Sequence, residues 1–187
     1  MTFAGHTIET APEQAKPLIA GVRRKLGFVP EPVARMAESP ELLGAFLDNA
    51  AVFDRTTLSP VEREVVIMTL ATRVRCHYCV AMHSSILDKR SASADLIDGL
   101  REGRPLADVR LEALRRFTKA VIETGGDTDT AAFLAAGFTR RNALEVVLGI
   151  GAYTMSTFAN RLTGAPLDAQ FEEHRWDGYQ TGRSATG

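Results

Sequence analysis

One stretch near the middle of the chain constrains the fold more than any other. Ser59 is placed as a helix N-cap, Pro60 follows at the first helical position, and Glu62 lies three residues after the cap, where it completes a capping box. On a helix that starts there, the polar residues Glu62, Thr69 and Arg73 gather in one narrow wedge. Most of the remaining circumference is apolar, which is the pattern of a helix with a buried face.

The rest of the chain repeats the helical pattern. Strict alternation of β-branched residues, the mark of strands, is absent, and we find no internal repeat. Gly149 and Gly151 lie within a helical pattern, where we expect them to allow close helix packing. The sequence predicts an all-α fold. Besides the helix that starts at Ser59 and the one that follows it, further helices are expected. One runs from a capping box at Thr10 to Gly27, and the others run over 30–36, from Ser39 to Phe53, over 96–100, over 111–122, over 131–136 and from Thr139 to about Leu162.

Length and composition favour one domain. The chain has 187 residues and 45% hydrophobic residues, enough to bury one sizeable core. We therefore expect a single domain over residues 1–187. A loose N-terminal segment is expected at about 1–10, with a C-terminal tail at about 172–187 that is either loose or docks on another subunit.

Charge and cysteine content exclude several classes of function. The net charge is −1 and no run of Lys or Arg forms a stripe, so neither a nucleic-acid nor a membrane partner is expected. The N-terminal residues lack the pattern of a secretory signal, which favours a cytoplasmic protein. Two cysteines are too few for a disulfide-stapled secreted fold.

Those two cysteines lie close together, three positions apart, and a histidine follows them. With Cys76 as the reference and about 100° of rotation per helical residue, Cys79 falls at about 300° and His83 at about 340°. All three side chains therefore share one helix face. Two cysteines on one turn can approach within disulfide range, and a helix N-terminus favours the thiolate. This pattern indicates a pair that cycles between dithiol and disulfide.

Glu64 is the second unusual feature of the region. It falls on the apolar side of its predicted helix, near roughly 300° when Val61 is taken as zero. A carboxylate there needs a partner or a proton. A purely structural pairing with Arg63, Arg73 or Arg75 is the alternative to a role in chemistry.

The spacing of these residues resembles a known family. Glu64, Cys76-x-x-Cys79 and His83 resemble the signature of the alkyl hydroperoxidase AhpD branch of the carboxymuconolactone decarboxylase family. The resemblance extends over roughly residues 15–165. It includes the stretches Gly27-Phe28-Val29-Pro30, Ser39-Pro40-Glu41-Leu42-Leu43, Leu58-Ser59-Pro60 and Asn160-Arg161.

The chain departs from this family pattern at one place. AhpD enzymes have a histidine directly before the second cysteine, whereas this chain has Tyr78 there and His77 one position earlier. In this respect it is similar to the uncharacterised peroxidase-related branch. His77 and Tyr78 are therefore secondary candidates for the site, with packing as the alternative role for Tyr78.

The resemblance implies an AhpD-like helical bundle that reduces hydroperoxides. In this reading Cys76 and Cys79 are catalytic, His83 and Glu64 move protons, and an external thiol reductant resets the disulfide. Which cysteine attacks stays open, since the helix start favours Cys76 and the contact with His83 favours Cys79. No cofactor and no metal are implied, and the family resemblance implies a homo-oligomer, either a trimer or a hexamer.

Other interpretations of the same residues remain. The two thiols could be buried and inert, or Cys76, Cys79, His83 and Glu64 could bind zinc, although no second ligand cluster exists in the sequence. A lactone decarboxylase without redox chemistry is the alternative within the family, but such members typically lack the cysteine pair. A binding protein with vestigial thiols is the last alternative.

Overall fold

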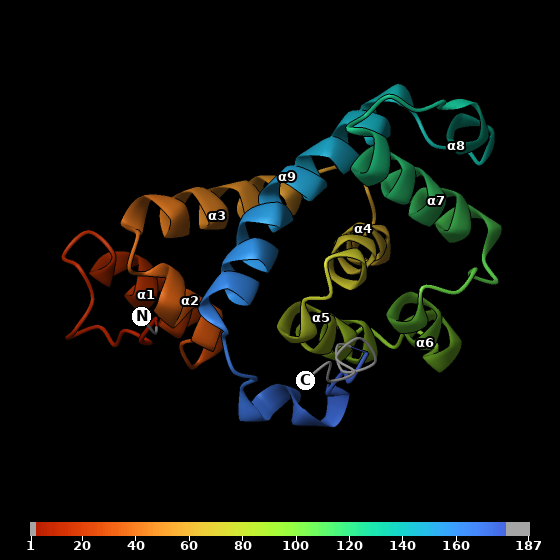
Figure 1. Cartoon of the computed structure of the whole chain (residues 1–187). Coiled ribbons are helices and arrows are strands. Elements are labelled where there is room, and N and C mark those ends of the chain that lie inside the picture. Colours follow the sequence, from red (N-terminus) through yellow and green to blue (C-terminus); the bar gives the residue numbers. More distant parts are fainter. Residues whose placement is uncertain (1–2, 179–187) are drawn as a thin grey trace, which may run out of the picture.

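The computed structural model describes residues 3–178, and within that range the chain forms helices and turns without strands, as the sequence predicts. Figure 1 shows their arrangement. The elements are α1 (Lys16–Leu26), α2 (Glu31–Met36), α3 (Pro40–Phe53), α4 (Pro60–Arg73), α5 (His77–Lys89), α6 (Ala94–Glu102), α7 (Val109–Thr124), α8 (Ala131–Ala135), α9 (Arg140–Thr163) and a 3-10 helix, η1 (Ala169–His174).

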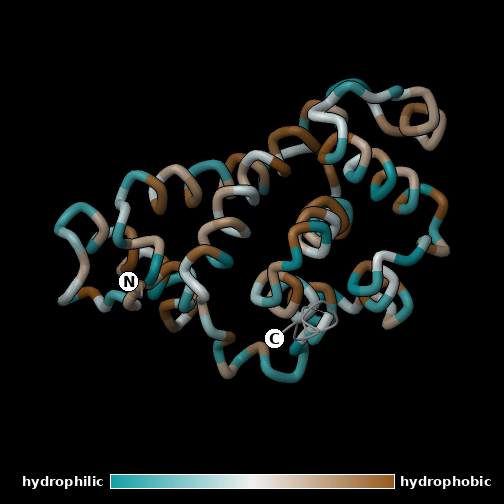
Figure 2. Tube along the Cα trace, in the orientation of Figure 1, coloured by the Kyte–Doolittle hydropathy of each residue, from teal (hydrophilic) through white to brown (hydrophobic). Residues whose placement is uncertain are grey.

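Helix α4 lies at the centre, in contact with α5, α6, α7 and α9 (Figure 1). Every residue from Glu64 to Ala71 is buried. In Figure 2 hydrophobic residues are concentrated on this helix, whereas the outer loops are largely hydrophilic. Of the two polar residues in this buried stretch, Thr69 is satisfied within the helix, because its hydroxyl donates to the carbonyl oxygen of Val65 at 2.6 Å. The carboxylate of Glu64 is also buried and needs a partner from another helix.

The predicted start of α4 is confirmed in detail. The side chain of Ser59 accepts from the backbone N–H of Glu62 at 3.2 Å, and Glu62 accepts from the backbone N–H of Ser59 at 2.7 Å. A second capping box at Thr139 starts α9. Each box satisfies N–H groups that a helix start leaves unpaired, so both helices begin where the sequence indicates.

The two glycines of α9 differ in their surroundings. A Cβ atom on Gly149 would lie 2.6 Å from the ring of Phe53 and 3.1 Å from Val66, so this glycine allows α9 to pack closely on α3 and α4. Gly151 is exposed, and nothing lies within 4 Å of its Cβ position. The expectation of close packing is confirmed for Gly149 and wrong for Gly151.

The first helix begins later than predicted. The expected capping box at Thr10 does not form, because the Thr10 hydroxyl accepts from the backbone N–H of Thr7 at 2.9 Å instead. Helix α1 begins at Lys16, with Pro17 in its first turn. Proline lacks the N–H that would bond four residues back, so a regular helix cannot extend through it toward Glu13.

Both terminal segments make contacts within the described range. The backbone N–H of His6 donates to the carbonyl oxygen of Ala34 at 2.9 Å. At the other end, Arg101 donates to the carbonyl oxygens of His174 and Arg175 at 2.9 and 2.8 Å, which holds η1 against the body of the protein. The rest of the predicted tail, residues 179–187, lies outside the described residues, and none of the described helices is long and apolar enough to span a membrane.

Candidate active site

The turn between α4 and α5 places the first cysteine. The backbone N–H of Cys76 donates to the carbonyl oxygen of Ala71 at 2.9 Å, and the N–H of Arg75 to that of Thr72 at 3.1 Å, which is the bonding pattern of a Schellman motif. Arg75 occupies the left-handed position of the motif, with φ 55°, where glycine is usual. The chain then reverses at once, so Cys76 becomes the N-cap of α5.

The two sulfur atoms face each other. Sγ of Cys76 lies 3.0 Å from Sγ of Cys79, and both side chains are free thiols. A disulfide bond has a length of about 2.05 Å, so closing it requires a shift of about 1 Å. The structure thus brings together the cysteine pair that the sequence indicates, in a geometry suited to a reversible bond.

Helix α9 holds this pair from the opposite side. Nδ2 of Asn160 lies 3.2 Å from Sγ of Cys79 and 4.0 Å from Sγ of Cys76. The next residue, Arg161, donates to the carbonyl oxygen of Val74 in the turn. Asn160 is 3% exposed, and its Oδ1 atom has no hydrogen-bond partner among the described residues. A buried acceptor without a partner is costly, so this oxygen is available to a ligand.

The environment of the two thiols is asymmetric. A hydrogen bond from Cys79 lowers the pKa of Cys76 below its ordinary value, against the effect of burial, and the backbone N–H of Cys79 and the amide of Asn160 act in the same direction. The pKa of Cys79 is raised well above its ordinary value because it donates to Cys76 and is buried. When the pair holds a single proton, the negative charge is therefore favoured on Cys76.

Glu64 and His83 form a buried pair across α4 and α5. Nδ1 of His83 lies 2.7 Å from Oε2 of Glu64, and the two side chains are 6% and 8% exposed. Arg63 and Arg73 form ion pairs with other carboxylates, and Arg75 forms none with Glu64. The partner of Glu64 is thus the histidine of the motif, which leaves Nε2 of His83 for other contacts.

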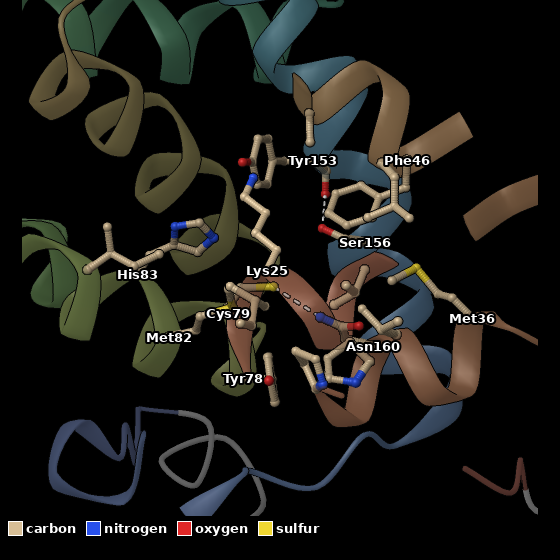
Figure 3. A pocket seen from close by; sticks show the side chains of 18 of the residues that line it. Lys25, Met36, Phe46, Tyr78, Cys79, Met82, His83, Tyr153, Ser156 and Asn160 are labelled. Atoms are coloured by element: carbon tan, nitrogen blue, oxygen red, sulfur yellow. Dashed lines mark hydrogen bonds between the residues drawn. The ribbon is translucent and has the colours of Figure 1, made fainter. Parts of the chain in front are cut away.

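A cavity of about 280 Å³ reaches this group. Glu64, Cys79, His83, Tyr153 and Asn160 line it, whereas Cys76 does not. Figure 3 shows the side chains of Cys79, His83, Tyr153 and Asn160 around the cavity, with the Asn160 amide directed at the sulfur of Cys79. The ring of Tyr153 meets that of His83 edge-on at 5.5 Å. Of the two sulfurs, Cys79 is the one that a molecule in the cavity can contact.

The cavity lies between two parts of the fold. Its far wall comes from α1, α2 and α3, with Val22, Met36 and Phe46 among the lining residues. The near wall comes from α4, α5 and α9, which carry the polar residues described above. Reactive groups on one wall thus face an apolar wall, an arrangement typical of binding sites for small molecules.

Tyr78 lines the cavity but does not bond to either sulfur. Its hydroxyl donates to Oδ2 of Asp168 at 2.5 Å, and its ring meets Phe171 edge-on at 5.9 Å. Burial and the neighbouring Asp168 raise the pKa of Tyr78 far above its ordinary value. The phenol therefore stays protonated and joins α5 to the segment that carries η1.

His77 lies outside the residues that line the cavity. Burial lowers its pKa, and a hydrogen bond with the backbone of Ala165 opposes that effect. Among residues 3–178, moreover, no group of three or more His, Cys, Asp or Glu side chains is arranged to hold a metal ion.

Part of the chain matches the profile of a known family. Residues 40–120 match the profile described as Carboxymuconolactone decarboxylase family. This segment is thus similar to the carboxymuconolactone decarboxylase family. The family segment begins at the start of α3 and ends within α7, so it contains Glu64, both cysteines and His83, whereas Asn160 lies beyond it.

Solved structures extend the likeness to the whole fold. An AhpD-core, uncharacterized peroxidase-related protein from Ralstonia eutropha JMP134 has a TM-score of 0.78 at 21% identity, covering 90% of this chain and 93% of that one. An uncharacterized peroxidase-related protein from Silicibacter sp. TM1040 has a TM-score of 0.75 at 21% identity, covering 91% and 93%.

A third similar structure is the debrominase Bmp8, a cysteine-to-alanine variant in complex with 2,3,4-tribromopyrrole, with a TM-score of 0.71 at 19% identity, covering 93% and 95% of the two chains. No curated protein sequence matches this chain. At these identities the structures show that the fold of this chain is AhpD-like. They leave its reaction to be argued from the site.

Asn160 and Tyr153 are the site residues that the sequence analysis does not single out as candidates. Asn160 appears there only as part of the resemblance, and Tyr153 not at all. They lie seven residues apart, with Ser156 between them, so all three fall on one face of α9, and all line the cavity. Polar side chains on the buried face of a long helix are the signal that points to them.

Proposed function

We propose that the protein reduces organic hydroperoxides through a cycle between the dithiol and disulfide forms of Cys76 and Cys79. The observation that carries the proposal is the sulfur pair, 3.0 Å apart, with one member open to a cavity that also holds His83 and Asn160. A thiolate is the form of cysteine that attacks peroxide, and the contact between the two sulfurs stabilises that form when the pair holds a single proton.

The first step takes place at Cys79. Transfer of the shared proton along the S···S contact makes Cys76 the thiol and Cys79 the thiolate. The Cys79 sulfur attacks the terminal oxygen of the hydroperoxide, an S–O bond forms, and the O–O bond breaks. The leaving alkoxide takes a proton and departs as an alcohol, while Cys79 becomes a sulfenic acid.

The second step closes the disulfide. Cys76 gives up its proton and attacks the sulfur of the sulfenic acid. The S–S bond forms, the S–O bond breaks, and the hydroxide takes a proton to leave as water. The two thiols have then supplied the two electrons that cleave the O–O bond, and an external dithiol or two monothiols restore the pair by exchange.

Glu64, His83 and Asn160 assist these steps in different ways. Glu64 orients His83 through the 2.7 Å contact, so that the imidazole holds or gives a proton on the cavity side. Nδ2 of Asn160 donates to the negative sulfur, and its unpaired Oδ1 is placed to accept from the O–H of a hydroperoxide. Each atom of the amide thus has a partner once substrate is bound.

Single serine variants test the proposal. Cys79→Ser is expected to abolish peroxide consumption, because the sulfur that contacts the cavity is gone. Without added thiol, Cys76→Ser is expected to consume about one equivalent of hydroperoxide and then stop, since the sulfenic acid has no second cysteine with which to form a disulfide. Hydroperoxide consumed per protein chain is measured without thiol for this stoichiometry and with excess dithiol for turnover. Unimpaired turnover in both variants would remove the proposal.

The same family contains lactone decarboxylases, and vestigial thiols are a further alternative. A decarboxylase does not need its thiols to change oxidation state, so the thiol count separates the two reactions. Inert thiols would likewise remain unchanged after exposure to hydroperoxide. Loss of two thiols together in the presence of substrate supports the redox cycle over both alternatives.

Self-association through α9 completes the proposal. The helix exposes four large apolar side chains, namely Leu144, Val147, Phe158 and Leu162, with 72%, 50%, 56% and 75% of their surface accessible. A row of this kind on one helix favours burial against a second copy of the chain. Sedimentation is expected to show a trimer or hexamer, and a monomer at all concentrations would contradict this part.

A further inference from the structure

The wall of the cavity indicates what kind of molecule enters it. Apart from the reactive groups, its lining is mainly apolar, with side chains from α1, α2, α3 and α5, among them Leu26, Val33, Leu47, Met82 and Ile86. An engineered cavity of about 150 Å³ holds benzene, so about 280 Å³ accommodates on the order of ten non-hydrogen atoms. The cavity therefore fits a medium-sized organic molecule better than hydrogen peroxide.

The charges around the cavity are unevenly paired. Glu64 is bonded to His83, and Asp54, near the outside, lies 3.6 Å from Arg63. The two cations that line the cavity have no such partner. Neither Lys25 nor Arg90 forms a hydrogen bond or ion pair through its side chain with any described residue, and both are exposed.

These two cations come from different elements that meet at the cavity. Lys25 lies in the last turn of α1, and Arg90 is the C-cap of α5. In Figure 3 the Lys25 side chain extends across the view of the cavity in the direction of Tyr153. Because both cations are exposed whereas Cys79 is buried, an anion bound to them would lie on the solvent side of the cavity.

We propose that the substrate is a medium-sized organic hydroperoxide that carries a carboxylate at the end opposite its hydroperoxy group. The carboxylate binds Lys25 and Arg90, the hydrocarbon part lies on the apolar wall, and the O–O bond meets Cys79. This proposal rests on the proposed peroxidase function and adds the class of its substrate. Charge-assisted contacts at one end orient the molecule so that the reactive end points inward.

Three probes separate this proposal from the function on which it rests. The first is a hydroperoxy acid of about nine carbons with the carboxylate and hydroperoxy groups at opposite ends, sized to the cavity. The second is its methyl ester, which has nearly the same shape and no charge. The third is cumene hydroperoxide, an apolar hydroperoxide without a head group. Steady-state kinetics with excess dithiol gives KM and kcat for each.

The acid is expected to show a lower KM than the ester, by about fivefold for each cation engaged. In the double variant Lys25→Met and Arg90→Met, the ratio of the two KM values is expected to fall to about one. Lys89→Met is the matched control, because Lys89 is an exposed cation next to Arg90 that does not line the cavity. High salt should reduce the preference for the acid in the unchanged protein.

Two outcomes would overturn the assignment at different levels. The carboxylate site would be refuted by equal KM values for acid and ester in the unchanged protein, or by a preference for the acid that persists in the double variant. Either result would leave the peroxidase function intact. Turnover of none of the three probes, cumene hydroperoxide included, would refute the peroxidase function itself and the substrate class with it.

Discussion

Replacement of Glu64 by glutamine tests how the buried acid contributes to the chemistry. The two side chains have nearly the same shape, so the glutamine can still reach Nδ1 of His83, which lies 2.7 Å from the native carboxylate. The substitution removes the negative charge. A hydrogen bond to a charged group contributes about 1.5–3 kcal/mol and a neutral one about 0.5–1.5 kcal/mol, so the contact weakens by about 1–1.5 kcal/mol.

The expected loss of rate follows from that difference. Each 1.36 kcal/mol corresponds to about tenfold in rate, so weaker orientation alone slows the peroxide step about tenfold. If the amide turns its NH₂ group toward His83, the imidazole must accept at Nδ1 and carry its proton on Nε2. The wrong tautomer would add to the loss, and we expect a total reduction of about 10- to 100-fold.

Rapid-mixing measurement of sulfenic acid and disulfide formation gives this rate directly. Glu62→Gln is the matched control, because Glu62 is also a buried carboxylate of α4 but serves the capping box and pairs with Arg110. This variant is expected to lower the melting temperature and leave the peroxide rate unchanged. An unchanged rate in Glu64→Gln, or equal losses in both variants, would show that Glu64 has only a structural role.

Three further results are expected. Because the pKa of Cys76 is lowered, ultraviolet titration should show that one thiolate forms below the ordinary thiol pKa of about 8.5. The peroxide rate should rise with pH over the same range. A titration midpoint at or above about 8.5 would contradict the stabilisation of the Cys76 thiolate by Cys79. Asn160→Leu should slow the peroxide step about tenfold and raise the midpoint of thiolate formation. Asn160→Asp should raise this midpoint further, because it places a carboxylate beside the sulfur. An unchanged midpoint in both variants would show that the Asn160 amide does not stabilise the thiolate. Burial by itself raises the pKa of Glu145, but hydrogen bonds from Thr57, Asn142 and Arg141 hold that pKa below its ordinary value. The stabilising effect of its carboxylate is therefore full above about pH 4.3 and is lost as pH falls through the lowered pKa. Calorimetry should show that Glu145→Gln lowers the melting temperature by about 3–6 °C at neutral pH and by less in acid.

The helices were predictable where a local signal acts alone. Ser59 and Thr139 each bond to the residue three positions on, and these bonds fix the starts of α4 and α9 without help from the rest of the chain. Thr10 has the same spacing to Glu13, but its hydroxyl bonds to Thr7 and Pro17 interrupts the pattern. A competing local partner therefore decided the start of α1, and the spacing alone does not show which partner prevails.

The candidate site was predictable only along one helix. Cys76, Cys79 and His83 share a face of α5 because their spacing is local. Glu64 belongs to a different helix, and the turn with Arg75 in the left-handed conformation sets its position relative to the cysteines. Asn160 is 84 residues from Cys76 and reaches the sulfurs only through the packing of α9, and no local pattern specifies that contact.

The central claim is that Cys76 and Cys79 act as one two-electron unit, and a stoichiometric titration tests it most directly. The reduced protein is treated with increasing amounts of an organic hydroperoxide without reductant, and free thiols, residual hydroperoxide and alcohol are counted. The account predicts that two thiols disappear and one alcohol appears for each hydroperoxide consumed, and that the product peptide contains a Cys76–Cys79 disulfide. Both thiols remaining free after exposure to excess hydroperoxide would contradict it.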